Sequence, residues 1–156
     1  MDLAPDFNEF LRSLTANGVE FVVVGAYAVA FHGVPRFTGD IDILVRPTAD
    51  NGRRLIAAVR EFGFPTDLLD ADEIAAGAKI VQMGVEPVQI HVMSRVSGVS
   101  WDEAWAGRAE ARIDDLHIPF IGRRELIRNK RAAGRLKDLA DIEALTPPGA
   151  TDPEKA

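Results

Sequence analysis

Residues 20–46 read EFVVVGAYAVAFHGVPRFTGDIDILVR, and this stretch decides how the rest of the chain is interpreted. Its first apolar run, residues 21–24, is short and rich in β-branched side chains, which is typical of a buried strand. Gly25 ends that run, and residues 26–31 have the composition of a short helix. Residues 40–45 resume the alternating pattern of a second strand. The stretch therefore predicts a strand, a helix and a strand.

Two acids share one face of the second predicted strand. Because side chains alternate along a strand, Asp40 and Asp42 point to the same side, while Ile41 and Ile43 point into a core. Two carboxylates about 7 Å apart repel each other unless a positive charge lies between them. Mg²⁺ prefers oxygen ligands and is usually held by one or two carboxylates together with substrate phosphates. We therefore expect Asp40 and Asp42 to bind one or two Mg²⁺ ions.

The bend at Gly25 predicts an anion site beside these acids. The first backbone N–H groups of a helix have no partner within that helix, so they can bind a phosphate group. We expect Gly25 and Ala26 to supply these donors. An ordinary core of strands and helix, with its acids facing solvent, is the alternative interpretation.

The order and spacing of these residues resemble a known signature. In the nucleotidyltransferase superfamily, whose fold is shared with DNA polymerase β, a hydrophobic residue and Gly-Gly or Gly-Ser precede an Asp-hydrophobic-acid strand. Gly25 and Ala26, separated from residues 40–42 by a gap that fits this signature, are similar to it. Arg36 and Thr38 match a form seen in AbiEii-type and antibiotic-modifying members. The resemblance implies that all four residues contact a nucleotide, with Ala26 offering only its backbone.

The third acid that the family typically uses has no counterpart here. The resemblance places it on a later strand beside the first two acids, and the matching strand, residues 88–93, carries His91 at that position. Three interpretations remain open. A histidine can act as a general base near neutral pH, or it can ligate a metal through a neutral ring nitrogen. Alternatively, the site is degenerate and binds nucleotide without efficient transfer.

A basic segment near the C-terminus is the second informative stretch. Lys130 and Arg135 have four residues between them and are followed by Asp138, which is similar to the K-x4-R motif and late aspartate of AbiEii-type nucleotidyltransferases. The resemblance implies that the two cations approach a triphosphate and that Asp138 orients them. The alternative is a solvated basic helix with ion pairs such as Lys137–Asp141.

The composition is that of a globular domain. The chain has 156 residues, of which 47% are apolar and 27% charged, and it has no cysteine, which excludes disulfides. No apolar run approaches the ~20 residues of a membrane span, and the N-terminus has no signal-like segment, so we expect a cytoplasmic protein without a membrane partner. The net charge of −6 argues against broad, non-specific nucleic-acid binding.

We expect an α+β (α/β) fold of the nucleotidyltransferase type, in which helices pack on a mixed β-sheet. Residues 1–145 would form the single domain and residues 146–156 a disordered tail. Beyond the opening stretch, the predicted helices are 5–16, 48–62, 67–76, a short one from 100, 124–133 and 137–145, and the predicted strands are 78–84, 88–93, 111–113 and 117–121.

The resemblance implies a Mg²⁺-dependent nucleotidyltransferase that moves a nucleoside monophosphate from an NTP to a hydroxyl acceptor. Its catalytic residues would be Asp40, Asp42, His91, Lys130 and Asp138, and its nucleotide-binding residues would include Lys130 and Arg135. The resemblance also suggests the toxin of a type IV toxin–antitoxin pair, with tRNA or a protein as acceptor and an antitoxin protein as partner. The alternatives are a small-molecule (antibiotic) nucleotidyltransferase, which often needs a helical acceptor domain, and a catalytically weak nucleotide-binding module.

Overall fold

A mixed β-sheet forms the centre of the molecule. The structure is a computed structural model that describes residues 3–34, 39–78, 80–85, 87–149 and 153. In this part of the chain the sheet has six strands in the order β3-β4-β2-β1-β6-β5. Their bounds are β1 Phe21–Val24, β2 Asp40–Val45, β3 Ile80–Val85, β4 Val88–Met93, β5 Ala109–Ile113 and β6 Leu116–Phe120.

The directions of the strands decide which of their ends lie side by side. β1 is antiparallel to β2 and parallel to β6, while β2 is parallel to β4. The edge strands β3 and β5 are each joined to their neighbour as an antiparallel hairpin. The end of β1 and the start of β2 therefore lie side by side, and the first half of β4 lies next to that point.

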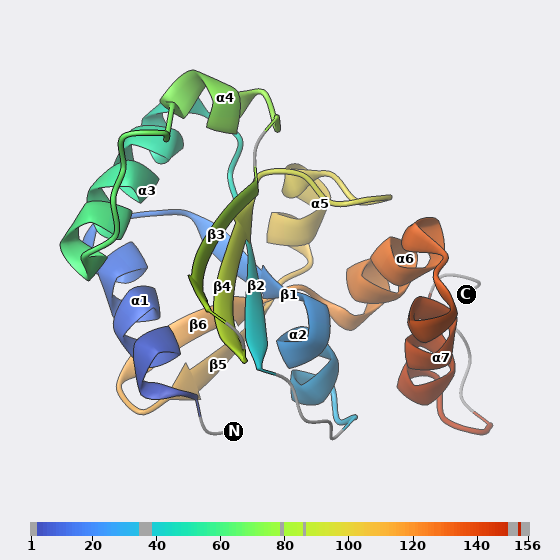
Figure 1. The fold of residues 1–156 in the computed structure, drawn as a ribbon. Helices are drawn as coiled ribbons and strands as arrows, with labels where there is room; N and C mark the ends of the chain where they lie inside the picture. Colours follow the sequence, from blue (N-terminus) through green and yellow to red (C-terminus); the bar gives the residue numbers. More distant parts are fainter. Residues whose placement is uncertain (1–2, 35–38, 79, 86, 150–152, 154–156) are drawn as a thin grey trace.

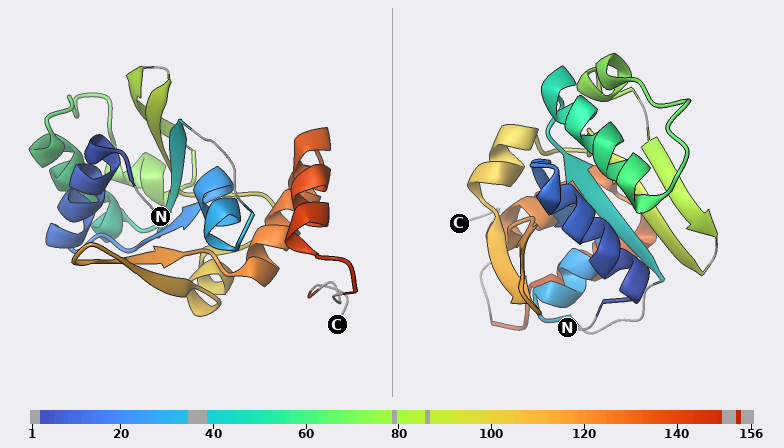
Figure 2. Two further views of the ribbon diagram at one scale, coloured as in Figure 1. Left: turned by 90° about the horizontal axis from the view of Figure 1, so that it is seen from below. Right: turned by 90° about the vertical axis from the view of Figure 1, so that its left-hand side faces the viewer.

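Helices pack on both sides of the sheet. α1 and α3 lie on one side of β1, β2 and β4, and α2 lies on the other side together with the α6–α7 hairpin (Figures 1 and 2). The helix bounds are α1 Pro5–Ala16, α2 Gly25–Phe31, α3 Ala49–Phe62, α4 Ala71–Ala75, α5 Trp101–Ala106, α6 Arg123–Ala133 and α7 Leu136–Leu145. Within the described ranges, no helix combines the length and apolar character needed to cross a bilayer.

The core sits between the sheet and its amphipathic helices. α1 buries an apolar stripe at helical spacing, made of Phe7, Phe10, Leu11 and Leu14. α3 begins at Thr48, whose side chain accepts a hydrogen bond from the Asn51 backbone at 3.1 Å, and ends at Gly63 in the left-handed conformation. The predicted α+β single-domain fold is confirmed.

Some element ends differ from the prediction. The helix predicted over 67–76 begins only at Ala71, because the Asp70 side chain accepts a hydrogen bond from the Asp72 backbone at 2.8 Å and so caps the helix there. β5 starts two residues earlier than predicted, at Ala109. Of the predicted tail, residues 150–152 and 154–156 lie outside the described residues.

Candidate active site

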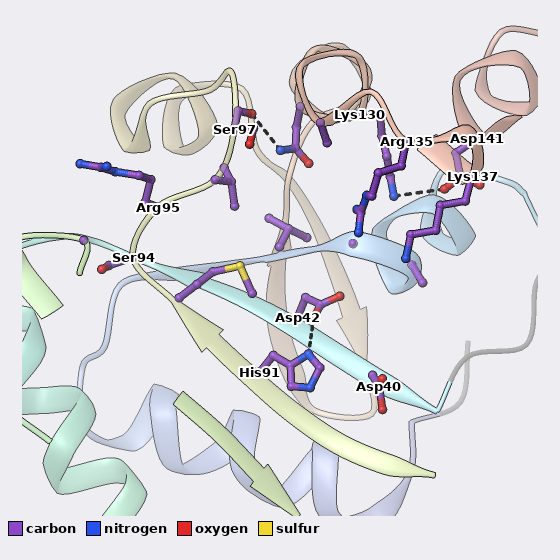
Figure 3. Close-up of a pocket in the computed structure, with 18 residues that line it drawn as sticks. Asp40, Asp42, His91, Ser94, Arg95, Ser97, Lys130, Arg135, Lys137 and Asp141 are labelled. Carbon is purple, nitrogen blue, oxygen red and sulfur yellow. Dashed lines mark hydrogen bonds and ion pairs between the residues drawn. The ribbon is translucent and has the colours of Figure 1, made fainter. Parts of the chain in front are cut away.

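The sheet topology brings the predicted site residues to one place. Val24 pairs with Asp42 across β1 and β2, so the chain enters Gly25 directly beside that acid. β2 and β4 pair Asp42 with His91 in parallel register. Figure 3 shows Asp40, Asp42 and His91 together on these two strands, beneath the basic residues of α6 and α7. Residues more than 60 positions apart in the chain therefore meet here.

Gly25 and Asp42 are in direct contact. Gly25 has φ +67°, a conformation that side chains with a Cβ rarely adopt. A Cβ on Gly25 would also collide with Oδ2 of Asp42. Glycine is thus needed twice at this position, once for the turn into α2 and once for the close approach of the carboxylate. Of the two predicted acids, Asp42 is thus the one in contact with the glycine bend.

His91 holds the other oxygen of Asp42. The Nδ1 atom of His91 lies 3.0 Å from Oδ1 of Asp42, and both side chains are about one-quarter exposed. Because an ionised carboxylate only accepts, Nδ1 carries the proton of this bond. The Nε2 atom lies 3.2 Å from the side-chain oxygen of Gln89. Asp42 and Gln89 therefore fix the orientation of the imidazole ring between them.

A pocket of about 720 Å³ lies over these residues. Its lining runs from the α2 bend across β2 and β4 to the loop after β4 and to α6 and α7 (Figure 3). Seven of the predicted residues line it, namely Gly25, Ala26, Asp40, Asp42, His91, Lys130 and Arg135. The predicted residues Arg36 and Thr38 lie outside the described part of the chain.

The predicted basic residues form a network with two acids. Lys130 is buried, and its Nζ lies 3.3 Å from Oδ1 of Asp138 and 3.1 Å from Oδ2 of Asp141. Arg135 donates from Nε to Oδ2 of Asp138 at 2.6 Å. The basic segment is therefore more than a solvated helix. Asp141, the partner of Lys137 in the solvated-helix alternative, forms an ion pair with the buried Lys130.

The pKa values in this network reflect its hydrogen bonds. Burial alone would raise the pKa of Asp138, but hydrogen bonds from Arg135 and Lys130 outweigh burial, and the net pKa of this carboxyl is lowered. The hydrogen bond to Asp138 is the main cause of a raised pKa at Arg135, and the charge of Asp42 also contributes to it. Arg135 thus interacts electrostatically with both Asp138 and Asp42.

Several pocket residues were missed by the sequence interpretation. The loop after β4 adds Ser94, Arg95 and Ser97, and α6 adds Asn129. Lys137 also lines the pocket. Their position directly after the strand that carries His91 is a signal that could have identified the loop residues.

The acids offer a fitting set of ligands for Mg²⁺, although they do not surround it. Among the residues that the structure describes, no group of three or more acids or histidines is arranged to hold a metal ion. Asp40 and Asp42 nevertheless both line the pocket, and the Asp42 carboxylate lies against the bend at Gly25. Two carboxylates with substrate phosphates and water form the usual Mg²⁺ environment.

Comparisons with known proteins give fold neighbours but no close relative. No family model matches the chain, and none of the curated proteins matches it. A candidate nucleotidyltransferase of Thermotoga maritima superposes with a TM-score of 0.58 at 14% identity, covering 86% of each chain. The lincosamide antibiotic adenylyltransferase LnuA, with lincomycin bound, superposes with a TM-score of 0.57 at 15% identity, covering 92% of this chain and 96% of that one. The chain has a nucleotidyltransferase fold.

A third neighbour has the same fold. An antigenic nucleotidyltransferase-like protein of Paracoccidioides brasiliensis superposes with a TM-score of 0.53 at 15% identity, covering 94% of this chain and 78% of that one. At such low identity these likenesses concern the arrangement of the elements. The predicted superfamily fold is therefore supported, while a special closeness to AbiEii-type proteins stays a prediction.

Proposed function

We propose that the protein is a Mg²⁺-dependent nucleotidyltransferase that moves a nucleoside monophosphate from an NTP to a hydroxyl acceptor. The observation that carries this proposal is the placement of the Asp42 carboxylate between the Gly25 bend and His91, in a pocket that Lys130 and Arg135 also line. An acid pair, the start of a helix and cations around one cavity match the needs of a triphosphate.

In the proposed reaction the acceptor hydroxyl loses its proton and its oxygen forms a bond to the α-phosphorus. The bond from that phosphorus to the bridging oxygen breaks, and pyrophosphate leaves with the electron pair. The backbone N–H groups of Gly25 and Ala26 bind phosphate, and Arg135 offsets charge that develops on the leaving group. Mg²⁺ held by Asp40 and Asp42 would supply electrostatic stabilisation of the entering and leaving oxygens.

Lys130 and Asp138 act differently from each other in this proposal. Lys130 lies at the pocket wall but shares its charge with two carboxylates, so it binds phosphate less strongly than an unpaired lysine would. Asp138 is fully buried and holds both Lys130 and Arg135. We therefore infer a positioning role for Asp138.

His91 is suited to accept the proton of the acceptor. With Nδ1 donating to Asp42, a neutral imidazole has Nε2 available as an acceptor, and Gln89 can rotate its amide to donate to that nitrogen until a substrate hydroxyl replaces it. The second candidate function, a weak nucleotide-binding module, is favoured by the same residue. In that case His91 simply occupies the place of a third acid.

The acceptor class stays open within this proposal. The likeness to LnuA spans nearly the full length of both chains, so the size of this chain is no argument against a small-molecule acceptor. The toxin role, a tRNA or protein acceptor, an antitoxin partner and a cytoplasmic location remain predictions from the resemblance. An acceptor screen with labelled NTPs distinguishes a macromolecular acceptor from a small-molecule acceptor. The label ends on a macromolecule in the first case and on a drug in the second.

The first prediction tests the acid pair directly. The double variant Asp40→Asn with Asp42→Asn should lose Mg²⁺-dependent NTP binding in calorimetry, because both carboxylate ligands are gone. Its free energy of unfolding should be unchanged or higher, since two like charges that lie on one strand face are removed.

A matched control removes the same charge elsewhere. Asp67→Asn with Asp102→Asn changes two exposed acids outside the pocket lining and should leave NTP binding intact. Unchanged Mg²⁺-dependent binding in the Asp40/Asp42 variant would disprove the proposed site. NTP binding without pyrophosphate release, for every acceptor tested, would favour the weak module.

A further inference from the structure

The sheet ends at β5, and one long side of this strand has no neighbouring strand. In the part of the chain that the structure describes, β6 is the one strand that pairs with β5. Figure 2 shows the β5–β6 hairpin at the outer edge of the molecule. An edge strand carries unpaired backbone groups to which another strand can add. No residue of β5 lines the pocket described above, so this edge is separate from the candidate active site.

The backbone of β5 presents two residues to the open side. In an antiparallel pair of strands, residue pairs that exchange both N–H···O bonds alternate with pairs that exchange none. Glu110 faces Pro119 across β5 and β6. Pro119 has no N–H, so it cannot complete a pair of the hydrogen-bonded kind. The N–H and C=O groups of Glu110, and by alternation those of Arg112, therefore point away from β6 and toward the open side.

The side chains of β5 also divide by face. Glu110 and Arg112 share the exposed face, while Ala109, Ala111 and Ile113 share the half-buried face. Ala111 and Ile113 pack against the core. Charges on an edge strand normally keep other strands away, unless charges of opposite sign come to face each other. The order of the charges along β5 thus decides which strand can add there.

We propose that β5 pairs with β5 of a second copy of this chain, antiparallel and centred on Ala111. The two sheets then join across a two-fold axis, and the interface is isologous, so every contact occurs twice. On the exposed face, Glu110 of one copy lies opposite Arg112 of the other. On the half-buried face, Ala109 of one copy lies opposite Ile113 of the other. The edge of β5 is therefore complementary to itself in both charge and apolar character.

The charges select this register from its neighbours. A shift by two residues in one direction would bring the two Glu110 side chains face to face, and a shift in the other direction would do so for the two Arg112 side chains. Like charges directly opposite each other are destabilising, whereas opposite charges stabilise a strand pair. The register centred on Ala111 also places Arg108, just before β5, opposite Asp114, just after it.

The backbone favours the same register. Glu110 and Arg112 are the residues of β5 whose N–H and C=O groups point to the open side. When these two residues lie opposite each other across the axis, they can exchange both N–H···O bonds. Ala111, whose groups point to β6, then lies opposite its own counterpart in a pair that needs no such bonds.

The edge is held in place before a second copy arrives. Asn8 of α1 donates to Asp114 at 3.1 Å, and Arg12 of α1 donates from Nη1 to Oδ2 of Asp115 at 3.2 Å. These contacts tie the turn of the hairpin to the body of the molecule. A preformed edge loses little conformational freedom on association, which favours binding.

The test is sedimentation of the full chain over a range of concentrations. β5 has five residues, so the interface is small, and we expect a dimer with a dissociation constant of about 10–100 µM. Arg112→Glu should raise this dissociation constant at least about tenfold, because Glu110 then faces a like charge at two symmetric places. Glu110→Arg should have the same effect. A chain that stays monomeric up to about 1 mM would overturn the proposal.

A mixture of the two variants distinguishes pairing from a merely structural role. The Arg112→Glu chain carries two acids on the exposed face of β5, and the Glu110→Arg chain carries two arginines there. When the two chains are mixed, both facing pairs are again of opposite sign, so a heterodimer should form although neither variant dimerises well alone. Circular dichroism checks that each variant is folded. Two folded variants that stay monomeric in the mixture would contradict the proposed register.

The matched control reverses the same charges on another element. Arg53→Glu and Glu61→Arg change exposed residues of α3. Alone or mixed, these variants should leave the dimer unchanged. If they weakened the dimer as much as the β5 variants do, net charge would be the cause and the proposal would fail.

Amide hydrogen exchange locates the contact on the backbone. The N–H groups of Glu110 and Arg112 should exchange more slowly as the protein concentration rises, because they become bonded across the axis. The N–H of Ala111, which points to β6, should show no such dependence. Concentration-dependent protection in β3, at the opposite edge of the sheet, with none in β5 would assign the dimer to the wrong edge and reject the proposal. None of these measurements involves NTP, so this inference and the proposed function can fail independently.

Discussion

Gly25 is the residue at which backbone conformation and site geometry meet. Its positive φ and its contact with the Asp42 carboxylate leave no room for a side chain. Gly25→Ala should therefore lower the free energy of unfolding by about 1–2 kcal/mol and weaken Mg²⁺-dependent NTP binding, because Asp42 must move. Urea unfolding and calorimetry measure the two effects.

Gly33→Ala is the matched control for this change. Gly33 has φ +99°, but a Cβ there would meet no atom within 4 Å. It should lose stability from backbone strain and keep NTP binding. If both variants lost binding to the same degree, the contact with Asp42 would have no part in the effect.

His91 allows a prediction about the missing third acid. His91→Asp should raise transfer activity, because a carboxylate at this position adds an oxygen ligand beside Asp42. Pyrophosphate release with saturating NTP is the measurement. A fall of pyrophosphate release to background would show instead that the reaction needs the imidazole, which supports the general-base role of His91.

Some site residues were predictable one by one and others were not. Strand alternation alone places Asp40 and Asp42 on a common face, and both line the pocket. The hydrogen bond from His91 to Asp42 depends on the register between β2 and β4, which no local pattern encodes. Arg95 was missed although it lies just after the strand that carries His91, because no motif marks the loop that brings it to the pocket.

At the scale of elements, the α6–α7 hairpin is held by a buried ionic network. Lys130 lies between Asp138 and Asp141, and all three side chains are at least nine-tenths buried. Asp138→Asn should lower the free energy of unfolding by about 3 kcal/mol, because it leaves a buried cation with one fewer partner. Chemical denaturation measures the loss.

An exposed carboxylate provides the comparison for Asp138. Asp50→Asn in α3 removes an acid paired with Arg53 and Arg54 on the surface, and its effect should stay below about 1 kcal/mol. Similar losses of unfolding free energy in the two variants would mean that burial of the network adds no stability.

Elements were predictable where local signals agreed. α1 and α3 combine an apolar stripe with clear end signals, and both begin within a residue of their predicted starts. The start of α4 was predicted wrongly, because Asp70 caps the helix, although Asp67 upstream of it also suits a helix start. Strand order was not predictable, since it depends on contacts between segments far apart in the chain.

At the scale of the whole molecule, acid should unfold the chain partly through Asp138. Its folded-state pKa is lowered, so the stability it contributes is fully present above the unfolded pKa of about 3.9 and is lost as the pH falls through the lower, folded value. The free energy of unfolding should therefore decrease below about pH 4. Asp138→Asn should decline less steeply over this range, and an identical decline would contradict the assignment.

The parallel pairing of β1 with β6 has a consequence for how the chain is made. Val23 pairs with Phe120, so the valine-rich β1 gains its second neighbour only after nearly a hundred further residues have been added. At ~5–20 residues per second, a ribosome needs about 5–20 s for this segment. Throughout that time one edge of β1 has unpaired backbone groups that can pair with other chains. We therefore expect chaperones to bind the nascent polypeptide until β6 emerges.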